Sequence, residues 1–138
     1  MIHLQNKSPK VLVIGDLMVD QYLWGSCERI SPEAPVQVIN VFNETALLGG
    51  AGNVVNNLKT LGAEVDVISV IGNCSISKEM KYLLREINVD TKYLTTQNKR
   101  KPSKKTRLIA SQQQVVRYDR ESNENINNTS EKEILINF

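Results

Sequence analysis

An alternation of apolar runs and helical segments most constrains how this chain can fold. KVLVIGD, residues 10–16, is a continuous apolar run ending in Gly-Asp, a pattern typical of a buried parallel strand. A helical pattern begins near Asn53 and ends at Gly62, which is placed as a C-terminal cap. The next strand-like run, EVDVISVIG, covers residues 64–72. The order predicts an α/β fold with a parallel sheet.

Two segments between the first strand and this helix alternate apolar and polar residues instead. QYLWG, residues 21–25, and VQVINVF, residues 36–42, flank the turn-rich CERISPEAP. Such alternation is typical of antiparallel strands with one solvated face. We therefore predict that a flap of antiparallel strands interrupts the parallel sheet.

The strand and helix alternation continues after residue 72. SKEMKYLLREI, residues 77–87, gathers its large apolar side chains on one helical face, with Ser77 in the predicted N-cap position. VDTKYLTT, residues 89–96, then predicts a further strand.

The last third of the chain begins with a basic stretch, NKRKPSKK, residues 98–105, which is predicted to be a solvated loop. Strands are expected over TRLIAS, residues 106–111, and QVVRYD, residues 114–119. Ser130 has capping-box spacing to a glutamate and predicts the start of a helix. Because the chain stops at Phe138, early in that helix, we expect it to be part of a longer domain.

The composition is that of an ordinary globular unit and excludes several kinds of site. The 138 residues are 41% hydrophobic and carry a net charge of +2, which gives no reason to expect binding to nucleic acid or to a membrane surface. One histidine, His3, and two separated cysteines, Cys27 and Cys74, leave little material for a zinc site or a Ser-His-Asp triad. With no apolar leader or bilayer-length run, we expect a cytoplasmic protein without a bound structural metal.

The glycine pair Gly49-Gly50 lies just before the predicted helix, and neither a G-x-G-x-x-G nor a Walker-type phosphate loop occurs in the chain. It either permits close packing or brings bare backbone near a ligand at the helix start. Asp16, Asp20 and Asn53 offer the short carboxylates and amide that bind adjacent sugar hydroxyls.

GGAGNVVNNLKTLGAEVDVISVIG, residues 49–72, resembles the first signature of the PfkB or ribokinase family of sugar kinases, with Val55 at a position where a smaller residue is usual. The segments at 29–36 and 105–121, RISPEAPV and KTRLIASQQQVVRYDRE, resemble the members of that family that phosphorylate D-glycero-D-manno-heptose 7-phosphate. The resemblance covers residues 10–121, except that GNCSIS replaces the usual Gly-Asp-Asp turn. It implies the amino-terminal part of a ribokinase-like three-layer α/β/α fold with an antiparallel β lid.

The resemblance also implies the roles of individual residues. Asp20, Gly49, Gly50 and Asn53 would hold sugar hydroxyls, and Asp16 is a secondary candidate. In this interpretation the glycine pair contributes to binding a sugar rather than a nucleotide phosphate.

The 7-phosphate of such a substrate needs cations, and arginine binds phosphate oxygens bidentately. Lys105, Arg107 and Arg117 lie on or beside the two late strands and are the candidates. Arg107 and Arg117 would share a face only if the register of the hairpin allows it. The alternative for each is a solvated surface charge.

The resemblance divides the protein into a sugar-binding part, residues 1–138, and an ATP-binding part that is absent from this chain. The lid strands would cover about 21–45 and 104–119. The family's catalytic base, an aspartate in a Gly-Ala-Gly-Asp motif, has no counterpart here and is expected downstream of Phe138. ATP and Mg²⁺ are therefore expected as cofactors of the full-length enzyme, and this chain alone is expected to be inactive.

The expected function is the transfer of phosphate from ATP to the 1-hydroxyl of heptose 7-phosphate, for ADP-heptose and the lipopolysaccharide core. The expected partners are the sugar phosphate and a second copy of the chain, bound through the lid. One alternative is another PfkB sugar kinase. Another is a truncated, non-catalytic protein whose lid strands mediate dimerisation or regulation.

Overall fold

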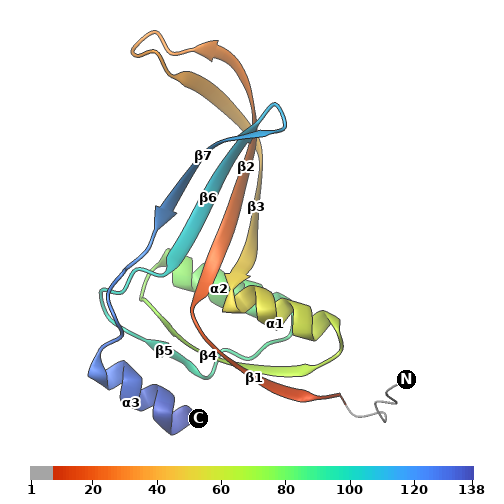
Figure 1. Cartoon of the computed structure of the whole chain (residues 1–138), viewed down its shortest axis with the longest axis vertical. Coiled ribbons are helices and arrows are strands. Elements are labelled where there is room, and N and C mark those ends of the chain that lie inside the picture. Colours follow the sequence, from red (N-terminus) through yellow and green to blue (C-terminus); the bar gives the residue numbers. More distant parts are fainter. Residues whose placement is uncertain (1–7) are drawn as a thin grey trace.

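The structure, a computed structural model, describes residues 8–138, so His3 lies outside the described residues. Within that range, none of the helices has the length and apolar character that crossing a membrane requires. The strands form two separate sheets, one of three strands and one of four (Figure 1). The elements in chain order are β1 (Lys10–Ile14), β2 (Leu17–Ile30), β3 (Gln37–Gly50), α1 (Ala51–Thr60), β4 (Glu64–Ile71), α2 (Ser75–Glu86), β5 (Leu94–Thr96), β6 (Ser103–Ala110), β7 (Gln113–Arg120) and α3 (Asn128–Asn137).

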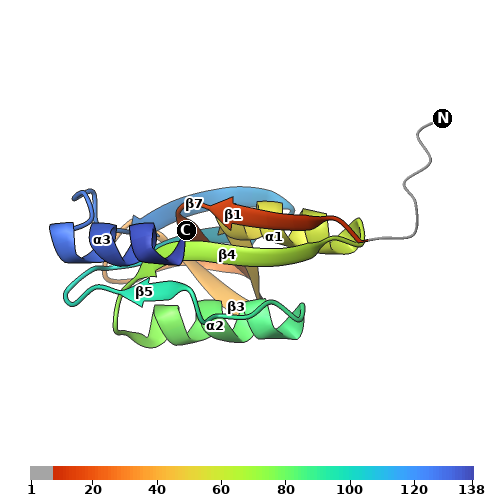
Figure 2. The same cartoon turned by 90° about the horizontal axis from the view of Figure 1, so that it is seen from below.

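The three-stranded sheet is parallel and has the order β1-β4-β5, as the alternation of strands and helices predicted. The predicted burial of β1 was wrong, because this strand lies at an edge of the sheet, with Leu12 40% and Ile14 51% exposed. The strand predicted over 89–96 is shorter than expected, since β5 covers only Leu94–Thr96. Figure 1 shows α1 and α2 on the side of this sheet that faces the four-stranded sheet, and α3 on the other side. Figure 2 shows its three strands side by side from below. The central strand, β4, is buried continuously from Val67 to Ile71, because elements cover both of its faces there.

The hydrophobic core lies between this sheet and the two helices α1 and α2. Val55 of α1 and Met80 and Leu84 of α2 are fully buried in the same cluster as Val67 and Ile71. Burial of one such side chain contributes about 1.5–3 kcal/mol relative to exposure. The parallel sheet therefore supplies the rigid base of the molecule.

The helix termini confirm one predicted cap and correct two others. Gly62 follows α1 with φ +88°, a left-handed conformation that glycine adopts without strain. The N-cap of α2 is Cys74 rather than Ser77, which is buried in the first turn of the helix. The N-cap of α3 is Asn127, whose side chain accepts a hydrogen bond from the Ser130 amide at 2.8 Å. Ser130 is therefore the third residue of that helix and not its cap.

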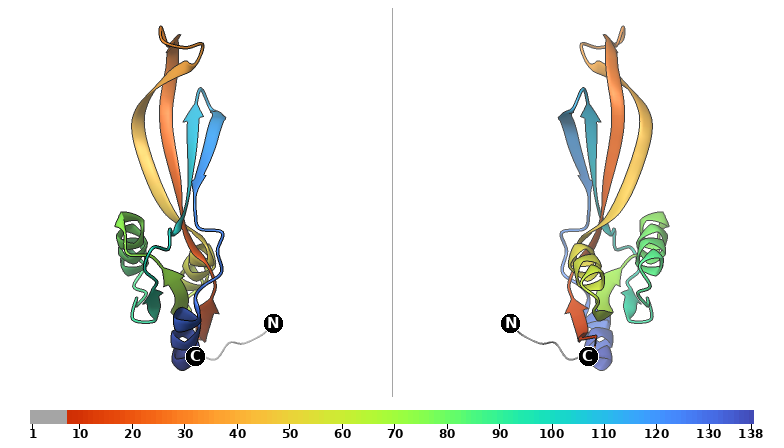
Figure 3. Two further views of the ribbon diagram at one scale, coloured as in Figure 1. Left: turned by 90° about the vertical axis from the view of Figure 1, so that its left-hand side faces the viewer. Right: turned by 90° about the vertical axis from the view of Figure 1, so that its right-hand side faces the viewer.

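The four-stranded sheet has the order β3-β2-β6-β7 and corresponds to the predicted antiparallel flap, here called the lid sheet. β2 and β3 pair antiparallel along their whole lengths, β6 joins β2 in parallel, and β7 returns antiparallel to β6. Figure 3 shows this twisted sheet rising from the base, with the β2–β3 ribbon extending beyond the β6–β7 hairpin. The basic stretch 98–105 is a loop only in part, because β6 already begins at Ser103.

The two faces of the lid sheet differ in their surroundings near its base. Val19 and Thr106 are buried, and Lys104 on β6 donates a hydrogen bond of 2.9 Å to Glu79 on α2. These residues lie on the face turned toward α2. Because side chains alternate along a strand, Asp20 and Lys105 project from the opposite face.

Candidate functional site

The candidate site is built around the junction where β3 ends and α1 begins. Gly50 is the N-cap of α1 and has φ +57°. The Ala51 amide donates a hydrogen bond of 3.0 Å to the Asp16 carbonyl, and a Cβ on Gly50 would lie 2.6 Å from that oxygen. The junction therefore requires a residue without a side chain at position 50.

Gly49, the preceding residue, is buried and lies opposite Met18 in the β2–β3 pairing. A Cβ at this position would collide with Asp20 Oδ2 and lie 2.8 Å from Met18 Cγ. The Asp20 carboxylate therefore rests directly on the Gly49 backbone. A carboxylate here repels a phosphate and suits ligand groups that donate hydrogen bonds, such as hydroxyls.

Arg107 provides the cation that faces Asp20. On β6, Arg107 lies opposite Tyr22, and its Nη1 donates a hydrogen bond to Asp20 Oδ1. The guanidinium carbon also lies 5.3 Å from the centre of the Tyr22 ring. The hydrogen bond to Asp20 raises the pKa of the Arg107 guanidinium. Arginine is charged at physiological pH in any case.

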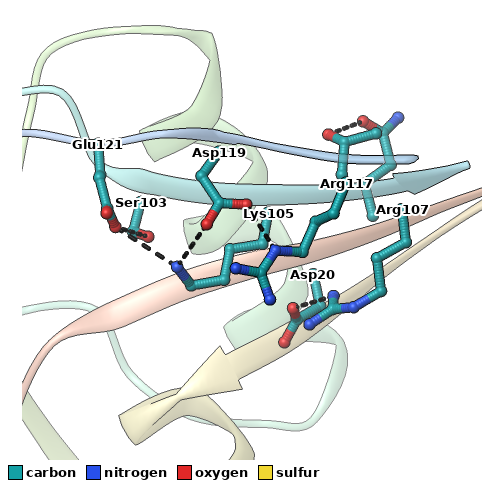
Figure 4. Close-up of polar contacts among 9 residues, drawn as sticks. Asp20, Ser103, Lys105, Arg107, Arg117, Asp119 and Glu121 are labelled. Atoms are coloured by element: carbon teal, nitrogen blue, oxygen red, sulfur yellow. Dashed lines mark hydrogen bonds and ion pairs between the residues drawn. The ribbon is translucent and has the colours of Figure 1, made fainter.

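Lys105 and Arg117 share the acidic side chains of β7 and its end (Figure 4). Lys105 Nζ lies 3.1 Å from Asp119 Oδ2 and 3.5 Å from a carboxylate oxygen of Glu121. The hydrogen bond to Asp119 raises the pKa of the Lys105 ammonium. Arg117 Nε lies 3.2 Å from the other Asp119 oxygen, and half of the Arg117 side chain is exposed.

The hairpin register meets the condition under which the two arginines share a face. Arg107 and Arg117 are direct partners across β6 and β7. Figure 4 shows both guanidinium groups on the same side of the lid sheet as Asp20 and Lys105. Three cations and three carboxylates thus alternate on one face, which we call the polar lid face: Asp20, Lys105, Arg107, Arg117, Asp119 and Glu121.

Two of the candidate residues contact none of this network. The Asp16 side chain is 81% exposed, and its one ion pair among residues 8–138 is with Arg100, at 3.9 Å. Asn53 is exposed in the first turn of α1, and no residue of the described range 8–138 forms a hydrogen bond with its side chain. The structure therefore brings Asp20, Gly49 and Arg107 into contact and leaves Asp16 and Asn53 at the adjoining strand and helix ends.

A comparison with protein families matches residues 8–137 of this chain to the pfkB family carbohydrate kinases. The chain belongs to this family. The family resemblance stated from the sequence is thereby confirmed.

A curated relative agrees with membership in the pfkB family, and solved structures agree with the fold. The chain is 63% identical over 133 residues to the Bifunctional protein HldE of Aliarcobacter butzleri, covering 96% of this chain and 28% of that protein. A carbohydrate kinase from Agrobacterium tumefaciens matches with a TM-score of 0.61 at 23% identity, over 81% of this chain and 35% of that one. A ribokinase of Arabidopsis thaliana, solved with ribose and ATP, matches with a TM-score of 0.60 at 17% identity, over 84% of this chain and 36% of that one. These structures confirm the ribokinase-like α/β fold, while the pfkB chain spans about a quarter of its curated relative.

The structure adds site neighbours to this pfkB chain that the sequence reasoning missed. Arg100, from the predicted solvated loop, is 12% exposed and lines a pocket of about 100 Å³ together with Asp16 and Met18. Tyr22 lies beside the Arg107 guanidinium. Met18, Asp20 and Tyr22 share a face of β2, because alternate residues of a strand do. The predicted strand began only at residue 21, so the sequence did not connect these three positions.

Proposed function

We propose that this chain is the sugar-binding part of an ATP-dependent kinase that phosphorylates the 1-hydroxyl of D-glycero-D-manno-heptose 7-phosphate. Membership in the pfkB family and the 63% identity to a Bifunctional protein HldE support a sugar kinase of this kind. The proposed place of the reaction is the cytoplasm, in the synthesis of ADP-heptose for the lipopolysaccharide core.

The observation that carries the proposal is the contact of Asp20 with Gly49 beneath the two arginines of the polar lid face. The carboxylate, resting on bare backbone, offers acceptors for sugar hydroxyls. Arg107 and Arg117 offer guanidinium groups for a phosphate on the same molecule. Gly50, Asn53 and Asp16 lie at the adjoining strand and helix ends, where further hydroxyls would bind.

ATP would supply the γ-phosphoryl group, and the resemblance assigns the proton of the 1-hydroxyl to an aspartate outside this chain. The acidic residue at the glycine pair disfavours a nucleotide phosphate there. Within residues 8–138, no group of three His, Cys, Asp or Glu side chains is placed to hold a metal ion, so we assign Mg²⁺ to no residue of this chain. The part played by this chain is to bind and orient the sugar.

Isothermal titration of the full-length protein against three sugars tests the proposal. We expect heptose 7-phosphate to bind more tightly than ribose, which has no phosphate for the two arginines to bind. We expect it to bind more tightly than fructose 6-phosphate as well, as the 63% identity to a Bifunctional protein HldE suggests. Preference for ribose or fructose 6-phosphate would favour the alternative of another PfkB sugar kinase.

We also propose a homodimer formed through the lid sheet. Phe42 and Ile30, on its outer ribbon, are 75% and 68% exposed, and the strand order leaves β3 and β7 as open edges in the described residues. Exposed apolar strands of this kind favour pairing with another chain. Sedimentation equilibrium of the full-length protein is expected to give twice the monomer mass, and replacement of Phe42 and Ile30 by serine is expected to halve it. A monomer at micromolar concentration would contradict this.

A further inference from the structure

The hydrogen bond between Arg107 and Asp20 places a cation on the group that the proposed function assigns to sugar hydroxyls. Asp20 Oδ1 accepts from Arg107 Nη1, while Oδ2 lies against Gly49. Only 21% of the Asp20 side chain remains exposed. The guanidinium therefore occupies an acceptor position of the carboxylate for which sugar hydroxyls would compete.

Arg107 differs from the other two cations in its set of partners. Lys105 is held between Asp119 and Glu121, and Arg117 is bound to Asp119, which it shares with Lys105. Within residues 8–138, Asp20 is the single carboxylate that pairs with Arg107. A guanidinium has five N–H donors, so Arg107 can exchange this partner for another anion without losing a charge-assisted hydrogen bond.

The position of Arg117 favours an anion on the far side of Arg107 from Asp20. The two arginines are direct cross-strand neighbours, and like charges in that arrangement repel each other. A dianion bound between them would remove the repulsion. The same dianion would attract the Arg107 guanidinium away from Asp20.

We propose that Arg107 is a specificity switch: it covers Asp20 in the empty site and turns to the phosphate of the incoming sugar, which releases Asp20 for the sugar hydroxyls. This inference rests on the proposed function, since it requires that Asp20 binds sugar. A sugar without a phosphate must displace Arg107 into water, whereas a sugar phosphate provides its new partner. The switch thus adds to the preference for phosphorylated sugars that the direct attraction of the phosphate already gives.

The test is the binding of heptose 7-phosphate and of dephosphorylated heptose to the full-length protein and its R107M variant, by isothermal titration. Methionine retains an unbranched stem and removes the donors. We expect heptose 7-phosphate to bind roughly 10-fold or more weakly, from the loss of charge-assisted hydrogen bonds. We expect dephosphorylated heptose to bind more tightly, by up to roughly 5-fold, because the competing ion pair is gone.

The matched control is R117M, which removes a neighbouring guanidinium that does not contact Asp20. R117M should weaken the binding of heptose 7-phosphate and leave the binding of dephosphorylated heptose unchanged. Unchanged or weaker binding of dephosphorylated heptose to a folded R107M protein would overturn the switch, and would assign Arg107 to phosphate binding alone or to positioning Asp20. The proposed function would survive that outcome, but it would fail if the wild-type protein did not bind heptose 7-phosphate.

A measurement on the wild-type protein tests the proposal without a variant that could misfold. Inorganic phosphate should tighten the binding of dephosphorylated heptose, because an anion on Arg107 and a sugar on Asp20 favour the same state. Potassium chloride of equal ionic strength controls for screening of the ion pair. No difference between phosphate and chloride would overturn the proposal.

Discussion

The parallel sheet and the lid sheet differ in what surrounds their strands. In the parallel sheet, β4 is buried continuously from Val67 to Ile71, whereas all eight residues of β7 in the lid sheet are exposed. The first sheet is stabilised by apolar contacts with α1 and α2. The second joins this core only at its base, through residues such as Leu17 and Val19, and depends elsewhere on backbone pairing and on ion pairs such as Asp20–Arg107. The chain thus separates a region that provides stability from one whose polar groups remain accessible to ligands and partners.

The largest expected effect is the loss of a core side chain beneath the parallel sheet. Leu84→Ala, at a fully buried position of α2, should lower the free energy of unfolding by about 2–5 kcal/mol, through lost burial and a residual cavity. Leu61→Ala is the matched control, since Leu61 is 82% exposed, and should change it by less than about 0.5 kcal/mol. Urea denaturation of the full-length protein measures both. If both substitutions lowered the free energy of unfolding equally, the distinction between buried and exposed positions in the base would be refuted.

The next effect concerns function in the lid sheet rather than stability. Asp20→Ala in the full-length enzyme should raise the KM for the sugar roughly 10- to 150-fold, the range for lost hydrogen bonds to a charged group. The KM for ATP should change far less. Steady-state kinetics measure both, with Asp66→Ala, an exposed carboxylate on β4, as the control. An equal rise for sugar and ATP would count against a role of Asp20 on the sugar side.

Gly49→Ala probes the junction of the two regions, because Gly49 lies one residue before the end of β3, the lid strand that leads into α1. The added Cβ would collide with the Asp20 carboxylate, so we expect a loss of about 1–3 kcal/mol in stability together with weaker sugar binding. Gly62→Ala has open space around the new Cβ and should cost about 1–2 kcal/mol from its positive φ, without affecting the sugar. Thermal unfolding and sugar titration of both variants separate these effects. Normal sugar affinity in Gly49→Ala would show that Asp20 need not rest on this glycine.

The parallel sheet was the more predictable region, because its signals are local. The apolar run 10–16 and the glycine at position 62 each indicate an element from a few neighbouring residues, and the structure confirms the strand and the helix end. The predicted burial of β1 was wrong, because a strand at the sheet edge leaves Leu12 and Ile14 exposed. The predicted start of α3 was wrong, and the reason is local as well. Asn127 and Ser130 are both good N-cap residues, and the sequence does not decide which of them accepts the hydrogen bond.

The site in the lid sheet could be predicted only in part, because it depends on contacts between distant strands. The sequence named Asp20, Gly49 and Arg107 as separate candidates, but their contact follows from the register of β2 with both β3 and β6. The lengths of β2 and β3 were underestimated for the same reason. Bulges near Trp24 and Cys27 break the alternation that the sequence analysis relied on, while pairing continues across them.

The smallest expected effect is the pH dependence that Lys105 gives to the lid sheet. Its hydrogen bond to Asp119 raises the pKa of Lys105 in the folded state above that of the unfolded chain. Such a group stabilises the fold at neutral pH, where its carboxylate partner is ionised, and its contribution is lost as the pH rises above about 10.4, the usual value for lysine. Because the pair is partly exposed, Lys105→Met should remove only about 0.2–1 kcal/mol at pH 8, with the difference from wild type vanishing near pH 12. Urea denaturation at both pH values measures this, and a difference that persists at pH 12 would mean that Lys105 acts through packing of its stem rather than through its charge.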